Sequence, residues 1–257
     1  MSSFDNIMPL ILAAGESEDF AAKGESPYPA LARYCRKHLY EHVLDAIRGA
    51  GLRGGVMIAG WEPVPSDDIR IVRGGANMKD SLWRGLKATE GAEFLLIATA
   101  DMPDLTSGAV KNFVELALQK KADVVYPVVP ADTCASEYRG MDRTVVRLRE
   151  GEVTGGNLFL IRRQALADNW ETICGFLELR KNVLKLAWKL GPAVMFKFIL
   201  GQLSLEELRI IASEILGVKA DVIVCLFSDA VTIGADADNW EQFQLFEKIN
   251  RRGLAKA

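Results

Sequence analysis

The sequence Leu10-Ile11-Leu12-Ala13-Ala14-Gly15 determines how the rest of the chain is interpreted, because an apolar run ends there on three small residues. Such a run is typical of a parallel strand buried on both faces, and small residues let the backbone beyond it approach a ligand. Residues 98–103 (ATADMP) follow a similar pattern, with Asp101 where the apolar run stops. We therefore predict a loop and a carboxylate at the same edge of one sheet.

The composition is that of a globular protein with a substantial core. The chain has 257 residues, of which 49% are hydrophobic and 25% charged, and its net charge is −3. This balance excludes disorder and gives no global attraction to nucleic acid. Four scattered cysteines and two histidines have no zinc-like spacing. No signal peptide or membrane span is recognised, so we expect the cytoplasm.

The first half of the chain alternates strands with helices. We expect strands at 8–13, 55–59, 69–72, 94–98 and 122–127, and helices at 39–50, 80–89 and 107–120. Such alternation predicts a three-layer, Rossmann-like α/β fold, with a mostly parallel sheet between two layers of helices.

The second half changes character. Strands are expected at 144–148 and 157–161 around a glycine-rich connection, then at 221–225 and 231–234, with a last helix at 240–250. The intervening residues are almost wholly helical. We interpret the chain as one domain, 1–257, with a helical insertion at about 168–218. Alternating cations and apolar residues at 180–190 favour a packed amphipathic lid over a membrane-surface contact through 180–200.

Two glycine-containing loops are candidate binding segments. Backbone amides of the loop at 13–28 could cradle phosphate oxygens, although the loop also suits an ordinary strand–helix connection. Residues 74–81 (GGANMKDS) could hold a base against the backbone. The same residues also suit a helix start capped by Asp80 or Ser81.

Three acids are candidate metal ligands. Asp101 follows a strand, where its carboxylate could hold magnesium or accept hydrogen bonds from turn amides. Asp236 and Asp238 are separated by one residue, so extended backbone would point both the same way. One of them could complete a site with Asp101, while Asp238 could also cap the last helix.

Six stretches, in this order, resemble the nucleotidyltransferase family with a glycosyltransferase-A-like fold. That family includes sugar-phosphate, molybdenum-cofactor and methylerythritol-phosphate nucleotidyltransferases. The matching stretches are LILAAG (10–15), LYEHVLDAIRGAG (39–51), GGANMKDSLWRGL (74–86), ATADMPDLT (98–106), TGGNLFLI (154–161) and IGADADNWEQFQLFEKI (233–249). The resemblance implies that an acceptor phosphate attacks the α-phosphate of a nucleoside triphosphate and releases pyrophosphate, with Mg²⁺ as cofactor.

The resemblance also implies roles for individual residues. It assigns the metal to Asp101 and Asp238, with Asp236 as a substitute ligand. The remaining positions are Ala13, Ala14 and Gly15 in the nucleotide loop, Gly75, Ala76 and Ser81 beside the base, and Gly156 and Asn157 on the acceptor side. The implied partners are a nucleoside triphosphate and a small phosphorylated acceptor, and a homodimer is left open.

The chain departs from the family pattern where the triphosphate would bind. The usual loop arginine is replaced by Glu18-Asp19-Phe20, and Pro29 stands at the usual lysine. We expect Lys23 to act as the replacement triphosphate contact. These departures favour one alternative, a catalytically degenerate protein that binds a nucleotide or nucleotide-sugar without turnover.

Overall fold

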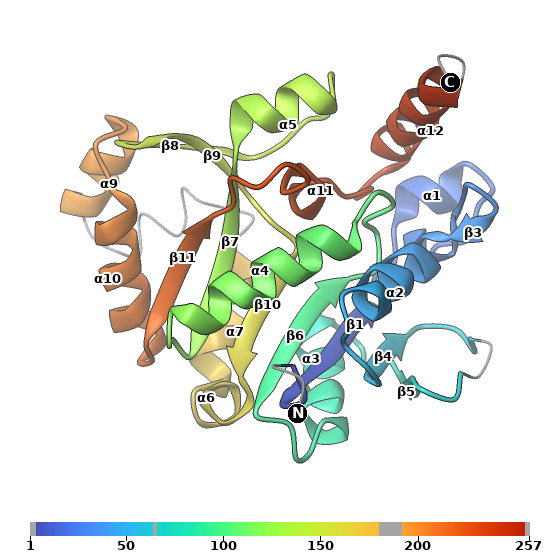
Figure 1. The fold of residues 1–257 in the computed structure, drawn as a ribbon, viewed down its shortest axis with the longest axis horizontal. Helices are drawn as coiled ribbons and strands as arrows, with labels where there is room; N and C mark the ends of the chain where they lie inside the picture. Colours follow the sequence, from blue (N-terminus) through green and yellow to red (C-terminus); the bar gives the residue numbers. More distant parts are fainter. Residues whose placement is uncertain (1–3, 64–65, 180–191, 255–257) are drawn as a thin grey trace.

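The computed structural model describes residues 4–63, 66–179 and 192–254. A nine-stranded sheet crosses these residues in the order β5-β4-β1-β6-β10-β7-β9-β8, and β11 pairs with β7 (Figure 1). Its strands are β1 (Ile7–Ala13), β4 (Val56–Ala59), β5 (Arg70–Arg73), β6 (Phe94–Thr99), β7 (Val124–Pro130), β8 (Val145–Leu148), β9 (Gly151–Gly155), β10 (Leu158–Arg162) and β11 (Ala220–Val224). A separate small hairpin joins β2 (Arg33–Tyr34) to β3 (Lys37–His38).

The sheet is mostly parallel, as predicted. β1 pairs in parallel with both β4 and β6, and β11 pairs in parallel with β7. β10 departs from this pattern, because it runs antiparallel between β6 and β7. β8 and β9 form an antiparallel hairpin that extends the sheet from the end of β7.

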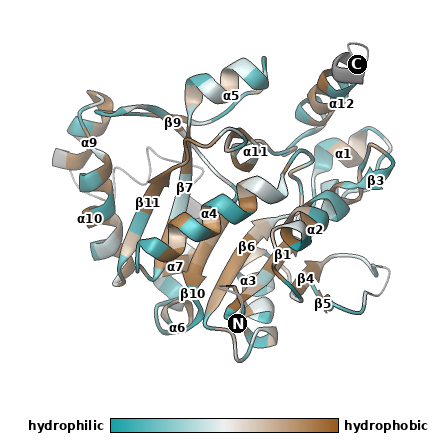
Figure 2. Cartoon of the chain, in the orientation of Figure 1, coloured by the Kyte–Doolittle hydropathy of each residue, from teal (hydrophilic) through white to brown (hydrophobic). Residues whose placement is uncertain are grey.

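Helices cover both faces of the sheet and give it three layers. α2 (Leu39–Gly49) and α4 (Ser107–Gln119) pack on one face, whereas α3 (Met78–Ala88), α6 (Arg163–Asp168) and α7 (Trp170–Leu179) lie behind the other (Figure 1). Each central strand serves both cores: in β6, Leu96 belongs to the α2–α4 side and Leu95 to the α3 side. This double burial explains why the sequence of β6 is continuously apolar. Figure 2 shows the hydrophobic residues concentrated on the central strands.

The remaining elements are short or lie at the rim of the sheet. α9 and α10 stand beside β11, and α1 lies near the start of α12 (Figure 1). Their bounds are α1 (Glu18–Ala22), η1 (Pro29–Leu31), α5 (Ala131–Glu137), α9 (Pro192–Ile199), α10 (Leu205–Leu216), α11 (Val231–Gly234) and α12 (Trp240–Leu254). Within the described ranges, no helix combines the length and the apolar character that crossing a bilayer requires.

Two predictions of local structure are wrong. Val231–Gly234 is a helical turn, α11, and not a strand: the Ile233 amide donates to the Ala230 carbonyl at 3.0 Å. A four-residue apolar run fits either state, and local hydrogen bonding decided it. The glycine-rich connection expected before 157 contains β9, which pairs with β7 and β8.

The proposed helical insertion contains α7, α9 and α10, and it remains a prediction as a domain feature. The amphipathic run at 180–190 lies outside the described residues, so its packing against the sheet or a membrane stays a prediction. α9 exposes two large apolar side chains, Phe196 and Ile199, and Leu200 directly after it is also exposed.

Candidate functional site

The structure brings together the three predicted metal-ligating acids. Asp101 follows β6, whereas Asp236 and Asp238 follow α11, yet one carboxylate oxygen of each lies within 4.8 Å of the others. A backbone hydrogen bond of 2.9 Å from the Ala237 amide to the Asp101 carbonyl joins the two segments. Convergence at the carboxyl ends of strands is where open α/β sheets place ligands.

Backbone hydrogen bonds through Asn157 hold these segments in register. The Thr99 amide donates to the Asn157 carbonyl at 3.3 Å, and the Asn157 amide donates to the Ile233 carbonyl at 2.9 Å. Beside it, a Cβ added to Gly156 would lie 2.6 Å from Ile233 Cγ2, so α11 approaches this turn at a distance that only glycine allows. The predicted acceptor-side turn therefore lies directly behind the acids.

Arg143 forms a buried ion pair with Asp236, which the sequence analysis did not anticipate. The Arg143 guanidinium donates to the Asp236 carboxylate and, through Nη2, to the Gly155 carbonyl at 3.1 Å. Only 14% of the Arg143 side chain and 6% of the Asp236 side chain are exposed. Burial lowers the pKa of the Arg143 guanidinium, and nearby groups including Asp238 and Asp101 oppose that effect. No motif marks Arg143, because its partner is 93 residues away.

Asp238 does not cap the last helix, so that alternative is wrong. α12 begins after Asn239, whose carbonyl accepts from the Phe243 amide at 3.1 Å and whose side chain accepts from the Gln242 amide at 2.9 Å. The Asp238 amide donates to Gln242 Oε1 at 2.9 Å. Together with the bond from the Gln242 amide to the Asn239 side chain, this contact resembles a capping box. The Asp238 carboxylate lies in the acidic cluster instead.

Asp19, one of the two acids that replace the expected loop arginine, has a structural role. The loop at 13–28 contains the short helix α1, in which Phe20 is fully buried against the rings of Trp240 and Phe243. The Asp19 carboxylate accepts a hydrogen bond of 2.7 Å from the Trp240 amide, at the electropositive start of α12. The nucleotide loop is thereby fastened to the segment that follows Asp238. Lys23 lies exposed at the end of α1.

The predicted base-binding segment adjoins the nucleotide loop. A Cβ added to Gly74 would lie 2.5 Å from the Ala14 Cβ, so the two segments touch. The Gly75 amide donates to Ser81 Oγ at 3.0 Å, a bond inside the segment. The predicted cap is wrong, because Asn77 caps α3 and accepts from the Asp80 amide at 2.8 Å.

The Ala76 amide also has a partner inside this segment, Asp80 Oδ2 at 3.1 Å. The two amides that the resemblance assigns to the base are therefore both bonded within the loop.

Arg73 is a second cation that the sequence interpretation missed. It ends β5 immediately before Gly74, and it is exposed. A hydrogen bond to Glu16 raises the pKa of Tyr28, whereas the nearby charge of Arg73 lowers it. Arg73 and Glu16 thus both act on a side chain of the nucleotide loop. The sequence held one indication that Arg73 lies near the nucleotide loop: it immediately precedes the glycine pair of the predicted base-binding segment.

A partly buried carboxyl, Asp104, lies in the turn that carries Asp101. Asp104 accepts hydrogen bonds from the hydroxyls of Tyr34 at 2.8 Å and Tyr138 at 3.2 Å. Burial raises the pKa of Asp104, although the two tyrosines and the charge of His42 oppose the shift. The native protein therefore keeps a proton on this carboxyl at a pH where the unfolded chain has lost it.

The consequence is a pH-dependent stability difference between the wild type and Asp104→Asn. Because the native pKa is raised, the favourable contribution of Asp104 is complete below its unfolded pKa, about 3.8, and is lost as the pH rises through the native pKa. We expect the unfolding free energy of the wild type, minus that of Asp104→Asn, to decrease from pH 4 to pH 7. Urea unfolding of both proteins at each pH measures this difference in unfolding free energy. A difference that increases with pH contradicts the assignment.

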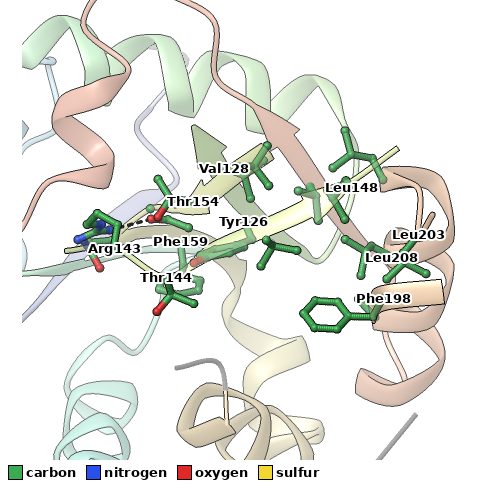
Figure 3. Close-up of a pocket in the computed structure, with 18 of the residues that line it drawn as sticks. Tyr126, Val128, Arg143, Thr144, Leu148, Thr154, Phe159, Phe198, Leu203 and Leu208 are labelled. Atoms are coloured by element: carbon green, nitrogen blue, oxygen red, sulfur yellow. Dashed lines mark hydrogen bonds between the residues drawn. The ribbon is translucent and has the colours of Figure 1, made fainter. Parts of the chain in front are cut away.

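A cavity of about 290 Å³ opens beside the acidic cluster (Figure 3). We call it the side cavity. Its polar end is lined by Asp142, Arg143, Asp236, Asp238 and Gln242, and its apolar end by residues of β7, β11, α9 and α10 and of the β8–β9 hairpin. Gly156 and Asn157 also line the cavity. In Figure 3, Tyr126 and Phe159 lie between Arg143 and the leucines of the apolar end.

The comparisons with known proteins show the family of the chain. Residues 9–180 match the model of the MobA-like NTP transferase domain. The chain belongs to this family. A hypothetical transferase structure from Thermus thermophilus is 34% identical, with a TM-score of 0.78, over 91% of this chain and 98% of that one.

Two further matches are more distant. A 2-C-methyl-D-erythritol 4-phosphate cytidylyltransferase, also from Thermus thermophilus, shares the fold with a TM-score of 0.57 at 16% identity, covering 96% of this chain and 99% of that one. A probable molybdenum cofactor guanylyltransferase from Mycobacterium avium (strain 104) is 31% identical over 124 residues, which are 46% of this chain. The match covers 61% of that curated relative, less than two thirds of its length.

The acidic cluster has the chemistry of a magnesium site. Mg²⁺ binds carboxylate oxygen and usually keeps several waters, so one or two carboxylates with space beside them are sufficient. Asp101 and Asp238 are only partly buried or exposed, whereas Asp236 is buried against Arg143. Asp101 and Asp238 thus fit the ion, and Asp236 is neutralised by its arginine.

Proposed function

We propose that the protein is a magnesium-dependent nucleotidyltransferase that transfers a nucleoside monophosphate from a nucleoside triphosphate to a small phosphorylated acceptor. The single observation that carries the proposal is the meeting of Asp101, Asp236 and Asp238 within 4.8 Å, at the strand ends of a nucleotidyltransferase fold. The acceptor phosphate oxygen would form the new bond to the α-phosphorus. The bond from that phosphorus to the bridging oxygen would break, and pyrophosphate would leave.

The residues divide into two groups in this proposal. Asp101 and Asp238 would hold Mg²⁺, which offsets the negative charge of the phosphates. Ala13, Ala14 and Gly15 would present backbone to the triphosphate, with Lys23 or Arg73 as the cation beside it. Arg143 would keep Asp236 in place, since this pair is buried and hydrogen-bonded to Gly155.

The binding-only alternative rests on the missing loop arginine and lysine, and on the acids that stand in the nucleotide loop instead. Like charges near a triphosphate are unfavourable. Asp19, however, accepts a hydrogen bond from the start of α12, and Glu16 interacts with Tyr28. These contacts give Asp19 and Glu16 structural partners, and pyrophosphate release decides between turnover and binding alone.

Pyrophosphate release is the direct test. We expect the purified protein to release pyrophosphate when one of the four ribonucleoside triphosphates and a phosphorylated acceptor are supplied with Mg²⁺, and to stop when EDTA removes the metal. Calorimetry with each triphosphate runs in parallel. Tight, magnesium-dependent binding without pyrophosphate release across the acceptor panel supports the binding-only alternative. If the protein neither binds a triphosphate nor releases pyrophosphate, both the transferase function and the binding-only alternative are contradicted.

A further inference from the structure

The apolar end of the side cavity is an unusual neighbour for a phosphate-transfer site. α10 contributes Leu208 and Ile211, and β11 contributes Val222. These aliphatic side chains are only partly buried, although they pack against a cluster of buried apolar residues between the sheet and α10. Well-packed cores leave few voids larger than a water molecule. A cavity of about 290 Å³ is near the lower limit of ~300 Å³ for small-molecule pockets.

The lining of this end selects against a polar occupant. Past Tyr126, its side chains are aliphatic apart from Phe198: Val128, Leu148, Val194, Leu203, Leu205, Leu208, Ile211, Ile215 and Val222. Those side chains offer no hydrogen-bonding group. A sugar or a nitrogen heterocycle placed there would lose its water partners without replacement, which is unfavourable. A hydrocarbon chain loses nothing and removes its own surface from water.

The opposite end of the same cavity would suit a phosphate with Mg²⁺ held at the acidic cluster, because the cation would offset the repulsion between carboxylates and phosphate. Asp236 and Asp238 of the acidic cluster line it, together with Arg143. Asn157 also lines it, and its side-chain Nδ2 is buried with no hydrogen-bond partner among the described residues. An acceptor oxygen in the cavity would supply the partner that this donor lacks. The cavity therefore has a polar end where a phosphate would bind and an apolar end where an aliphatic chain would bind.

From this arrangement we infer that the acceptor is an amphiphilic monophosphate, with its phosphate at the acidic cluster and its aliphatic chain in the apolar end of the side cavity. The inference rests on the proposed function and names its substrate class. An oxygen of the alkyl phosphate forms a bond to the α-phosphorus of the triphosphate, the α–β phosphoanhydride bond breaks, and pyrophosphate leaves. The product carries the nucleoside monophosphate joined to the alkyl phosphate by a new anhydride.

A series of ethyl, butyl, hexyl and octyl phosphate tests the inference. Each fully buried methylene should tighten binding about four-fold, and we expect octyl phosphate to bind at least roughly fifty-fold more tightly than ethyl phosphate. Calorimetry with Mg²⁺ and without nucleotide measures binding, and its heat-capacity change should become more negative with chain length. In the pyrophosphate assay, kcat/KM should rise along the same series.

Two substitutions of Leu208 test whether the alkyl chain of the acceptor binds in the apolar end of the side cavity. Leu208→Asp places a charge in the apolar end, and Leu208→Trp fills that end while it stays apolar. Both should remove the advantage of octyl over ethyl phosphate. The matched control is Ile210→Asp on the same helix, because Ile210 is 48% exposed and does not line the cavity. Circular dichroism establishes that each variant is folded.

The outcomes separate this inference from the proposed function. Pyrophosphate release that is equally efficient with ethyl and octyl phosphate overturns the inference and keeps the function. Chain-length-dependent binding that Leu208→Trp removes, without pyrophosphate release, keeps the cavity assignment and overturns the function. Equal effects of Leu208→Trp and Ile210→Asp on octyl phosphate binding also overturn the inference.

Discussion

Asp101→Asn is expected to lower kcat for pyrophosphate release by at least about 100-fold, because metal neutralisation of phosphate charge contributes several kcal/mol to the transition state. Asparagine keeps the shape of the side chain but removes the negative charge that holds the cation. The Asp101 carboxylate shares a 4.8 Å cluster with two others, and no other acid in the described residues belongs to it. Steady-state assays across a magnesium titration measure the loss.

A second measurement for Asp101→Asn does not depend on turnover. A ligand at 100 times its dissociation constant stabilises the native state by about 2.7 kcal/mol, which in a protein of this size raises Tm by roughly 5 to 11 °C. We expect Mg²⁺ with the preferred triphosphate to give such a rise in the wild type and little in Asp101→Asn. The control is Asp132→Asn, an exposed carboxylate at the start of α5. An undiminished rise in Asp101→Asn would remove Asp101 from the metal site.

Arg143→Met is expected to cause the largest loss of stability, about 3 to 5 kcal/mol, because it leaves the Asp236 carboxylate buried without its cation. Only 6% of the Asp236 side chain is exposed, so water cannot replace the guanidinium. The Gly155 carbonyl loses a hydrogen bond of 3.1 Å in the same substitution. A fall in Tm of roughly 6 to 20 °C corresponds to this loss, and urea unfolding measures the free energy directly.

Two further variants identify the cause of that loss. Arg147→Met removes an arginine four residues along the chain, whose ion pair with Glu152 is 72% and 49% exposed, so the loss should stay below about 1 kcal/mol. Adding Asp236→Asn to Arg143→Met should recover part of the stability, since the buried charge is then gone. If the double variant is less stable than Arg143→Met, burial of an unpaired charge is not the mechanism.

The position of Asp101 was predictable, and the partner of Asp236 was not. Asp101 stands after the apolar strand β6, and that pattern indicates the carboxyl edge of the sheet. Asp238 was placed at the same edge by a predicted strand at 231–234, which the structure shows as the helical turn α11. Arg143, the partner of Asp236, lies in a connection without helical or strand periodicity, and the two are 93 residues apart. Only folding could reveal this pair, because ionic contacts carry no period that a single sequence displays.

The nucleotide loop shows the same limit in another form. From its sequence, Glu18-Asp19-Phe20 indicates two charges beside a triphosphate. In the structure, Phe20 is buried on α12 and Asp19 accepts the Trp240 amide at 2.7 Å. The meaning of these residues depended on a helix that lies far along the chain, which local patterns do not contain.

By itself, the sequence determined the layered α/β architecture, since periodic burial of apolar residues is a local property that repeats along each strand and helix. It also determined that Asp101 would follow a strand at the sheet's edge. The tertiary structure alone decided which cations neutralise the acids of the site and which apolar surfaces enclose the neighbouring cavity. Both depend on side chains that meet only when distant segments pack, so the chemistry of the site is a property of the fold as a whole.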